Sequence, residues 1–198
     1  MPTPQPPADS LTVGTHVEHL PGKRAAKADE IMKAVDNTLL EPVLRRHPLG
    51  EVKVVSKLMN ENSEPVAGLY LYDGRKVFIN RSAEPAAYNQ KFKPNRMSPV
   101  AEAAATPLDY QQRAFVHEMG HHLYGILSKT LQDRVYKDYV TVATAGQTIT
   151  AYAMTHEREY LSESLAAYID HCDDLKEYDR IGFDLVEAAL AEAAPKGG

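Results

Sequence analysis

The chain has very little cysteine, because Cys172 is the only one among its 198 residues. An intramolecular disulfide framework and a cysteine-rich zinc finger are therefore both excluded, and histidines and carboxylates remain as the metal ligands to look for. The chain also lacks any apolar run approaching the roughly 18 residues that cross a bilayer, so we expect no membrane partner. It contains no internal repeat.

An excess of positive charge is absent as well. Lysine and arginine together number 22 against 27 acidic residues, which gives a formal net charge of −5 and a pI near 5.9. Because phosphate binding needs a basic surface, nucleic acid is not expected as a partner. The hydrophobic fraction of 43% and the charged fraction of 25% are typical of a globular protein of one domain.

The N-terminus shows no basic segment followed by an apolar one, so a secretory signal peptide is not predicted. We expect a cytoplasmic protein or one that is released by a route independent of a signal. Four prolines among the first seven residues predict a disordered, proline-rich arm over residues 1–22. A single domain is expected over residues 23–198.

The first half of that domain combines a helical region with a small sheet. Apolar residues at spacings of three and four predict a helix over residues 25–47, which Pro42 breaks or restarts. Three β-rich segments follow, at residues 51–58, 66–72 and 76–81. Asp73-Gly74 predicts a hairpin between the last two. We expect a small antiparallel or mixed sheet, most simply an antiparallel meander.

The second half is predicted to be helical. Residues 82–106 have no clear period and are expected to form a long loop. Thr106 as N-cap, followed by Pro107 at the first helical position, predicts a helix that runs to about Leu127. Further helices are expected over about 130–140, 155–172 and 178–193. The expected fold class is α+β, with N-terminal helices, a small sheet, a central helix and a C-terminal helical subdomain.

The central helix contains an HExxH motif, His117-Glu118-Met119-Gly120-His121. Two histidines four residues apart lie on one helical face, about 6 Å apart along the axis, where both can bind one zinc ion. Glu118 points about 100° around the helix, where it can take a proton from zinc-bound water without binding the metal. The alternative is an ordinary amphipathic helix with surface or core histidines. His122 is expected to face the core or the solvent.

Catalytic zinc commonly has a third protein ligand. No histidine follows His121 at the spacing of the extended metzincin motif, so a glutamate on a later helix is the next candidate. Glu159 and Glu163 share a face of the helix predicted there, whereas Glu157 points elsewhere. One of the pair can bind zinc, and the other can accept the free N–H of a zinc histidine. The alternative is a charged amphipathic helix with solvated glutamates.

This arrangement resembles the gluzincin metallopeptidases, in particular the catalytic domain of anthrax lethal factor and the Pro-Pro endopeptidases. The resemblance rests on HEMGHH at residues 117–122 and on three residues at the family's spacing, Tyr152, Glu159 and Glu163. It extends in motif over about residues 115–168. It implies a zincin-like fold and one zinc ion per chain, bound by His117, His121 and Glu159.

The resemblance also assigns roles around the metal. Glu118 is the implied general base, and Glu163 matches the carboxylate that orients a zinc histidine. Tyr152 matches the tyrosine that stabilises the oxyanion. Leu161 and Ser162 depart from the family's pattern, in which an aromatic and a small residue are usual.

The implied function is a zinc-dependent endopeptidase that hydrolyses a peptide bond through a zinc-bound water activated by Glu118. Two alternatives stay open: a catalytically inactive binding or structural protein with the zincin fold, and a zinc hydrolase of a non-peptide amide. The expected partner is an extended peptide or protein substrate, paired with residues 76–81 as an edge strand. We expect the chain to be a monomer.

Overall fold

The computed structural model describes residues 24–36, 38–60, 65–81 and 107–194. Its elements in chain order are α1 (Arg24–Met32), the 3₁₀ helix η1 (Lys33–Val35), α2 (Leu40–Arg46), β1 (Glu51–Val55), β2 (Gly68–Leu71), β3 (Lys76–Asn80), α4 (Pro107–Ile126), α5 (Lys129–Ala145), the 3₁₀ helix η2 (Tyr152–Met154), α6 (Glu157–Asp170), α7 (Cys172–Tyr178) and α8 (Arg180–Ala193). The described part is mostly helical and carries a three-stranded mixed sheet. The predicted α+β class is therefore confirmed.

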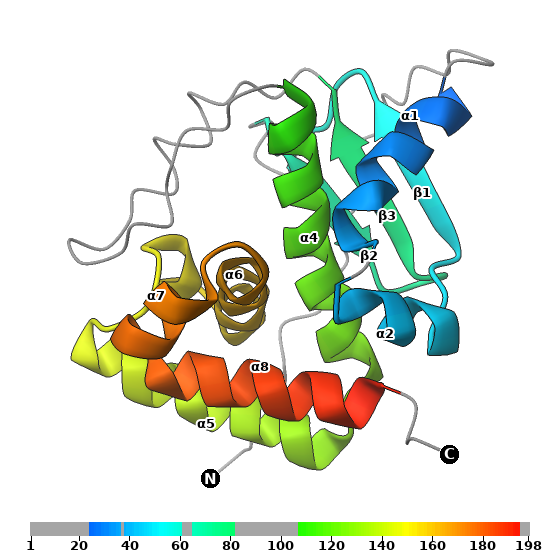
Figure 1. Ribbon diagram of the computed structural model, residues 1–198. Helices are drawn as coiled ribbons and strands as arrows, with labels where there is room; N and C mark the ends of the chain where they lie inside the picture. The colour runs from blue at the N-terminus through cyan, green and yellow to red at the C-terminus, as the bar shows by residue number, and fades with distance from the viewer. Residues whose placement is uncertain (1–23, 37, 61–64, 82–106, 195–198) are drawn as a thin grey trace, which may run out of the picture.

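Helix α4 is the central element of the fold. Figure 1 shows it between the sheet with α1 and α2 on one side and the helices α5 to α8 on the other. Phe115, Met119 and Leu123 on this helix are fully buried, as expected for a helix that packs on both sides. The central position of α4 lets it present one face to the sheet and another to α6.

The sheet has the strand order β1-β3-β2. The predicted hairpin is confirmed: β2 and β3 are antiparallel, and Gly74 takes a φ of 72° in the turn between them. The predicted meander is wrong, because β1 pairs with β3 in parallel. Residues 56–67 carry the chain from β1 to the opposite edge, and the hairpin then inserts β3 in the middle. Val77 and Ile79 of β3 are fully buried, which suits a central strand.

This strand order also corrects the expected edge. Residues 76–81 cannot receive a substrate strand, because β3 is paired on both sides. β2 is the edge of the sheet that lies on α4. Asn80 at the end of β3 donates its amide N–H to the carbonyl oxygens of Leu58 and Val66, so these two residues are held against the central strand.

The predicted helices are present with shifted boundaries, and α7 is a further helix that the sequence did not predict. The break in the first helical region falls between η1 and α2, and Pro42 lies in the first turn of α2, where a missing N–H costs little. Helix α5 is longer than predicted and ends at Ala145, and the residue that caps it, Gly146, has a φ of 65°. The last predicted helix begins at Arg180, because Asp179 caps it and accepts the N–H of Gly182.

Three predicted features lie outside the described residues, namely the arm over 1–22, the loop over 82–106 and the N-cap at Thr106. Across the described ranges, none of the helices is both long enough and apolar enough to span a membrane.

Candidate metal centre

The HExxH motif occupies the middle of α4 and turns both histidines toward α6. The imidazole rings of His117 and His121 lie with their centroids 5.2 Å apart. His117 is buried and His121 is half-buried. The one-turn spacing of the motif therefore produces a pair of neighbouring imidazoles, as the sequence predicts.

The glycine inside the motif explains how α6 comes so close. A Cβ on Gly120 would lie 2.6 Å from Oγ and 2.8 Å from Cβ of Ser162, which is far inside contact distance. The absence of a side chain therefore lets the backbones of α4 and α6 meet at this point. The contact sets the acidic face of α6, with Glu159 and Glu163, against the two histidines.

Glu159 faces both imidazoles. Its Oε2 atom lies 3.0 Å from Nε2 of His117 and 3.5 Å from Nε2 of His121, and it is buried with no hydrogen bond of good geometry to the protein. Potential ligand atoms of the three residues all lie within 4.8 Å of one another, the one such group among the residues described. Two imidazole nitrogens and a carboxylate oxygen that converge in this way fit the His₂Glu donor set of catalytic zinc.

Electrostatics keep this carboxylate ionised. Burial opposes the charge on Glu159, but the imidazoles of His117 and His121 outweigh it and lower the pKa of Glu159 well below the usual range. An ionised glutamate is the form that binds a metal cation. The residue thus has the charge state of a ligand.

Glu163 lies one helical turn further along and has a different task. Nδ1 of His117 donates to its Oε1 atom over 2.7 Å, and the hydroxyl of Thr150 donates to its Oε2 atom over 2.8 Å. Burial opposes a charge on His117, but the two glutamates outweigh burial and raise the pKa of His117 well above its ordinary value, so Nε2 also carries a proton toward Glu159. Because Glu163 holds the Nδ1 proton, Nε2 is the nitrogen that would give up its proton to bind a metal. The geometry thus distinguishes the two glutamates that the sequence left interchangeable.

Thr150 is a member of the site that sequence reasoning missed. Its hydroxyl oxygen also accepts the backbone N–H of Ala153, over 3.1 Å, and therefore ties Glu163 to the start of η2. The residue is buried. No local pattern marks a threonine in a break between helices as a partner of a carboxylate 13 residues away, so only the packed structure reveals it.

Glu118 lies on the opposite, sheet-facing side of the histidines. It is 5% exposed and packs on β2 at Gly68, where a Cβ would lie 2.5 Å from its Oε1 atom. The backbone N–H of Tyr70 donates to its carboxylate. Burial raises the pKa of Glu118, and the neighbouring histidines partly offset that rise. A buried carboxylate beside the donor set, and outside it, has the setting of a general base.

Tyr152 reaches the same cluster from η2. Its ring lies 5.9 Å from that of His117 between centroids. Burial, together with the nearby carboxylates and a hydrogen bond to Glu159, raises the pKa of Tyr152 far above its ordinary value. The phenol therefore stays protonated and acts as a hydrogen-bond donor toward the centre of the site.

A buried histidine supports the sheet side of the site. Nε2 of His122 lies 2.8 Å from the backbone oxygen of His47, and Nδ1 lies 3.0 Å from the hydroxyl of Tyr70. Because the N–H at Nε2 donates to the carbonyl oxygen of His47, Nδ1 has a lone pair and accepts the hydrogen bond from the hydroxyl of Tyr70. His122 is fully buried, so of the two expected positions it takes the core. It anchors the tyrosine whose N–H holds Glu118.

No family model, curated protein or solved structure matches the chain. The resemblance to gluzincins therefore rests on the residues of α4, η2 and α6 themselves.

Proposed function

We propose that the protein is a zinc-dependent endopeptidase with a zincin-like fold, similar to the gluzincins. The observation that carries this proposal is the convergence of His117, His121 and Glu159 on one point, with the carboxylate of Glu118 beside it and outside the donor set. Three ligands from two helices and an adjacent buried base are the parts that metal-assisted hydrolysis requires.

Each residue of the site has a separate role in the proposed hydrolysis. Zinc, when bound, acts as a Lewis acid on the scissile carbonyl and makes water more acidic. Glu118 accepts a proton from the attacking water and delivers it to the amine nitrogen as the C–N bond breaks. Tyr70 keeps that carboxylate in place through its backbone N–H. The hydroxyl of Tyr152 donates a hydrogen bond to the oxygen that gains negative charge.

The substrate strand is expected on β2. Ala67 accepts a ladder hydrogen bond from Asn80, and the alternation of an antiparallel pair then turns the backbone groups of Gly68 and Tyr70 away from β3. The N–H of Tyr70 is engaged by Glu118, so the backbone of Gly68 and the carbonyl of Tyr70 are the groups that would face a substrate strand. Among the strands described, none pairs with this side of β2. An extended peptide that adds to this edge would lie beside Glu118.

The test has two stages. Protein purified without chelator should contain one zinc ion per chain by elemental analysis and should cleave members of a broad peptide library, and a chelator should abolish the cleavage. Glu118→Gln should keep the zinc and the fold but lose nearly all hydrolysis, because only the base is removed. The exposed Glu177 on α7 offers the control, and Glu177→Gln should cleave normally.

The outcomes separate the competing functions. If no zinc can be loaded, the metal centre and the proposed mechanism are both wrong. Zinc without peptide cleavage would favour the inactive binding protein or the hydrolase of a non-peptide amide. Full activity in Glu118→Gln would contradict its role as the base.

A further inference from the structure

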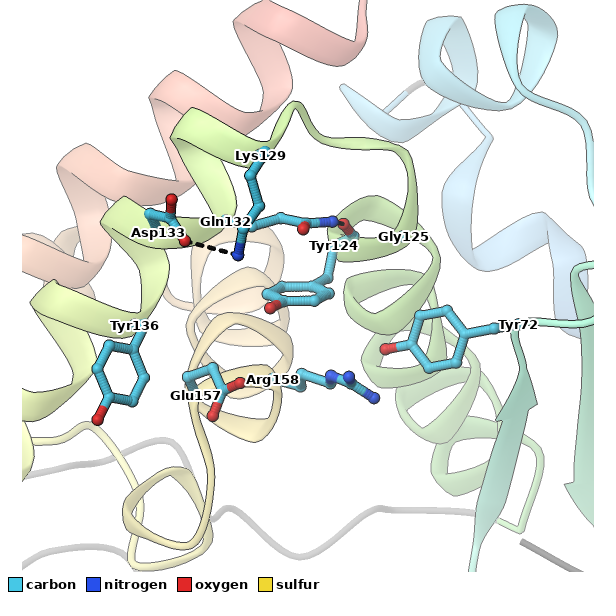
Figure 2. Close-up of a pocket in the computed structure, with 9 residues that line it drawn as sticks. All are labelled: Tyr72, Tyr124, Gly125, Lys129, Gln132, Asp133, Tyr136, Glu157 and Arg158. Carbon is cyan, nitrogen blue, oxygen red and sulfur yellow. Dashed lines mark hydrogen bonds and ion pairs between the residues drawn. The ribbon is translucent and has the colours of Figure 1, made fainter. Parts of the chain in front are cut away.

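A cavity of about 510 Å³ lies where β2 ends. Its lining comes from β2's end, α4, α5 and the start of α6 (Figure 2). The lining residues are Tyr72, Tyr124, Gly125, Lys129, Gln132, Asp133, Tyr136, Glu157 and Arg158. The volume is within the range of cavities that accommodate small ligands, so one amino-acid side chain and several waters fit.

Arg158 lies at the centre of this lining. Figure 2 shows its side chain extending from α6 toward Tyr72. The guanidinium carbon lies 5.0 Å from the ring centroid of Tyr72 and 5.3 Å from that of Tyr124. Two cation–π contacts hold the planar group in a defined position. Gly125 contributes by leaving room, because a Cβ there would lie 3.1 Å from the Tyr72 ring.

Both carboxylates in the lining of the cavity have partners other than Arg158. The carboxylate of Asp133 is engaged by Lys129 over 2.7 Å, and Oε2 of Glu157 lies 3.1 Å from Nδ1 of His156. A guanidinium carries five N–H donors in a fork that matches a carboxylate, so it can serve several partners at once. The phenol groups of Tyr124 and Tyr136 add further possible donors.

Residues that line the cavity are neighbours in sequence of residues in the proposed reaction site. Arg158 directly precedes the candidate ligand Glu159, and Tyr72 directly follows β2, whose edge is the expected position of the substrate backbone. Burial raises the pKa of Tyr72, and the carboxylate of Glu159 is near enough to add a smaller contribution in the same direction. A peptide paired with β2 would therefore extend from the metal centre toward this cavity.

We propose that the cavity is a substrate subsite that selects an aspartate or glutamate side chain through Arg158. The inference rests on the proposed peptidase function for the identity of its ligand. It predicts a property of binding, however, so it can be tested without measuring hydrolysis.

The probe is a set of fluorescein-labelled heptapeptide pools, each with one fixed residue and random residues elsewhere. Glutamate, glutamine, lysine or phenylalanine is fixed at each position in turn. Affinities for zinc-loaded Glu118→Gln protein are measured by fluorescence anisotropy. At one position, the glutamate pool should bind about tenfold more tightly than the glutamine pool, as one charge-assisted contact provides.

Substitutions locate the effect. Adding Arg158→Gln should remove the preference for glutamate and leave the zinc content unchanged. Arg134→Gln should retain it, because Arg134 lies on α5 outside the cavity and pairs with Asp138. The proposal is overturned if the glutamate and glutamine pools bind equally at every position, if lysine or phenylalanine is preferred at the selective position, or if folded Arg158→Gln keeps the preference. Because this experiment measures binding and not cleavage, the preference for glutamate can be determined even if the protein has no peptidase activity.

Discussion

Nδ1 of His117 donates a hydrogen bond to Oε1 of Glu163 across 2.7 Å, between two helices and 46 residues apart in the sequence. This contact keeps a proton on Nδ1 and leaves Nε2, which lies 3.0 Å from Oε2 of Glu159, as the nitrogen that can bind a metal. It also leaves Glu163 acceptor capacity for the hydroxyl of Thr150. The candidate metal centre thus depends on a chain of buried hydrogen bonds behind its ligands.

Replacing Glu163 should weaken the metal centre without removing a ligand. Glu163→Ala is expected to lower zinc affinity by roughly 10–100-fold, because His117 loses the acceptor that fixes its tautomer. Competition against a fluorescent zinc chelator measures the change. Glu157→Ala on the same helix is the matched control and should bind zinc as the wild type does. Equal affinity of Glu163→Ala and wild type would mean that this carboxylate is only structural.

Removing the Tyr152 hydroxyl should slow the reaction and spare the metal. In Tyr152→Phe the ring that packs on His117 is kept, so zinc content and thermal stability should hardly change. The turnover number should fall by roughly 10²–10³-fold, the typical loss of one oxyanion donor, with little change in KM. Steady-state kinetics on a peptide from the library screen checks this. A wild-type turnover number would reduce Tyr152 to a packing residue.

Gly120→Ala should disturb the crossing of α4 and α6. The added methyl group has no space beside Ser162, and overpacking of this kind costs about 1–3 kcal/mol. Thermal unfolding should therefore begin several degrees lower, and zinc affinity should fall as Glu159 moves away from the histidines. Lys137→Ala on α5 is the control, since Lys137 is exposed. If Gly120→Ala were as stable as the wild type, the close approach of α4 and α6 at this point would be unimportant for stability.

Asp179 should give folding stability a pH dependence. Burial raises its pKa to about 6, although it accepts hydrogen bonds from Gly182 and Tyr160. Because folding raises this pKa, the folded protein binds the proton more tightly than the unfolded chain does. The contribution of Asp179 to stability is therefore present below about pH 4 and is lost as the pH rises through about 6.

The substitution that isolates this effect is Asp179→Asn, which keeps an oxygen to accept both hydrogen bonds. Between pH 4 and pH 7, the free energy of unfolding of Asp179→Asn should increase relative to that of the wild type by up to roughly 3 kcal/mol. Urea denaturation at pH 4, 5, 6 and 7 provides the comparison. A constant difference across this range would show that the carboxyl does not titrate there.

Local features of the fold were predictable from the sequence. The period of apolar residues indicates the helices, Asp73-Gly74 indicates the hairpin, and the spacing of His117 and His121 places two imidazoles on one face. Each of these follows from the geometry of residues fewer than about ten apart, which the backbone fixes before any tertiary contact forms. The candidate ligands on α4 belong to this class.

Tertiary packing decided the rest. The insertion of β3 between β1 and β2 depends on which strand buries most apolar surface, so the sequence predicted the hairpin but the wrong neighbour and the wrong edge. The different tasks of Glu159 and Glu163 depend on the helix crossing at Gly120 and on Thr150. These contacts join residues far apart in the chain, and their cost in chain entropy is recovered only when a complete core forms around them. No local sequence pattern predicts these long-range contacts.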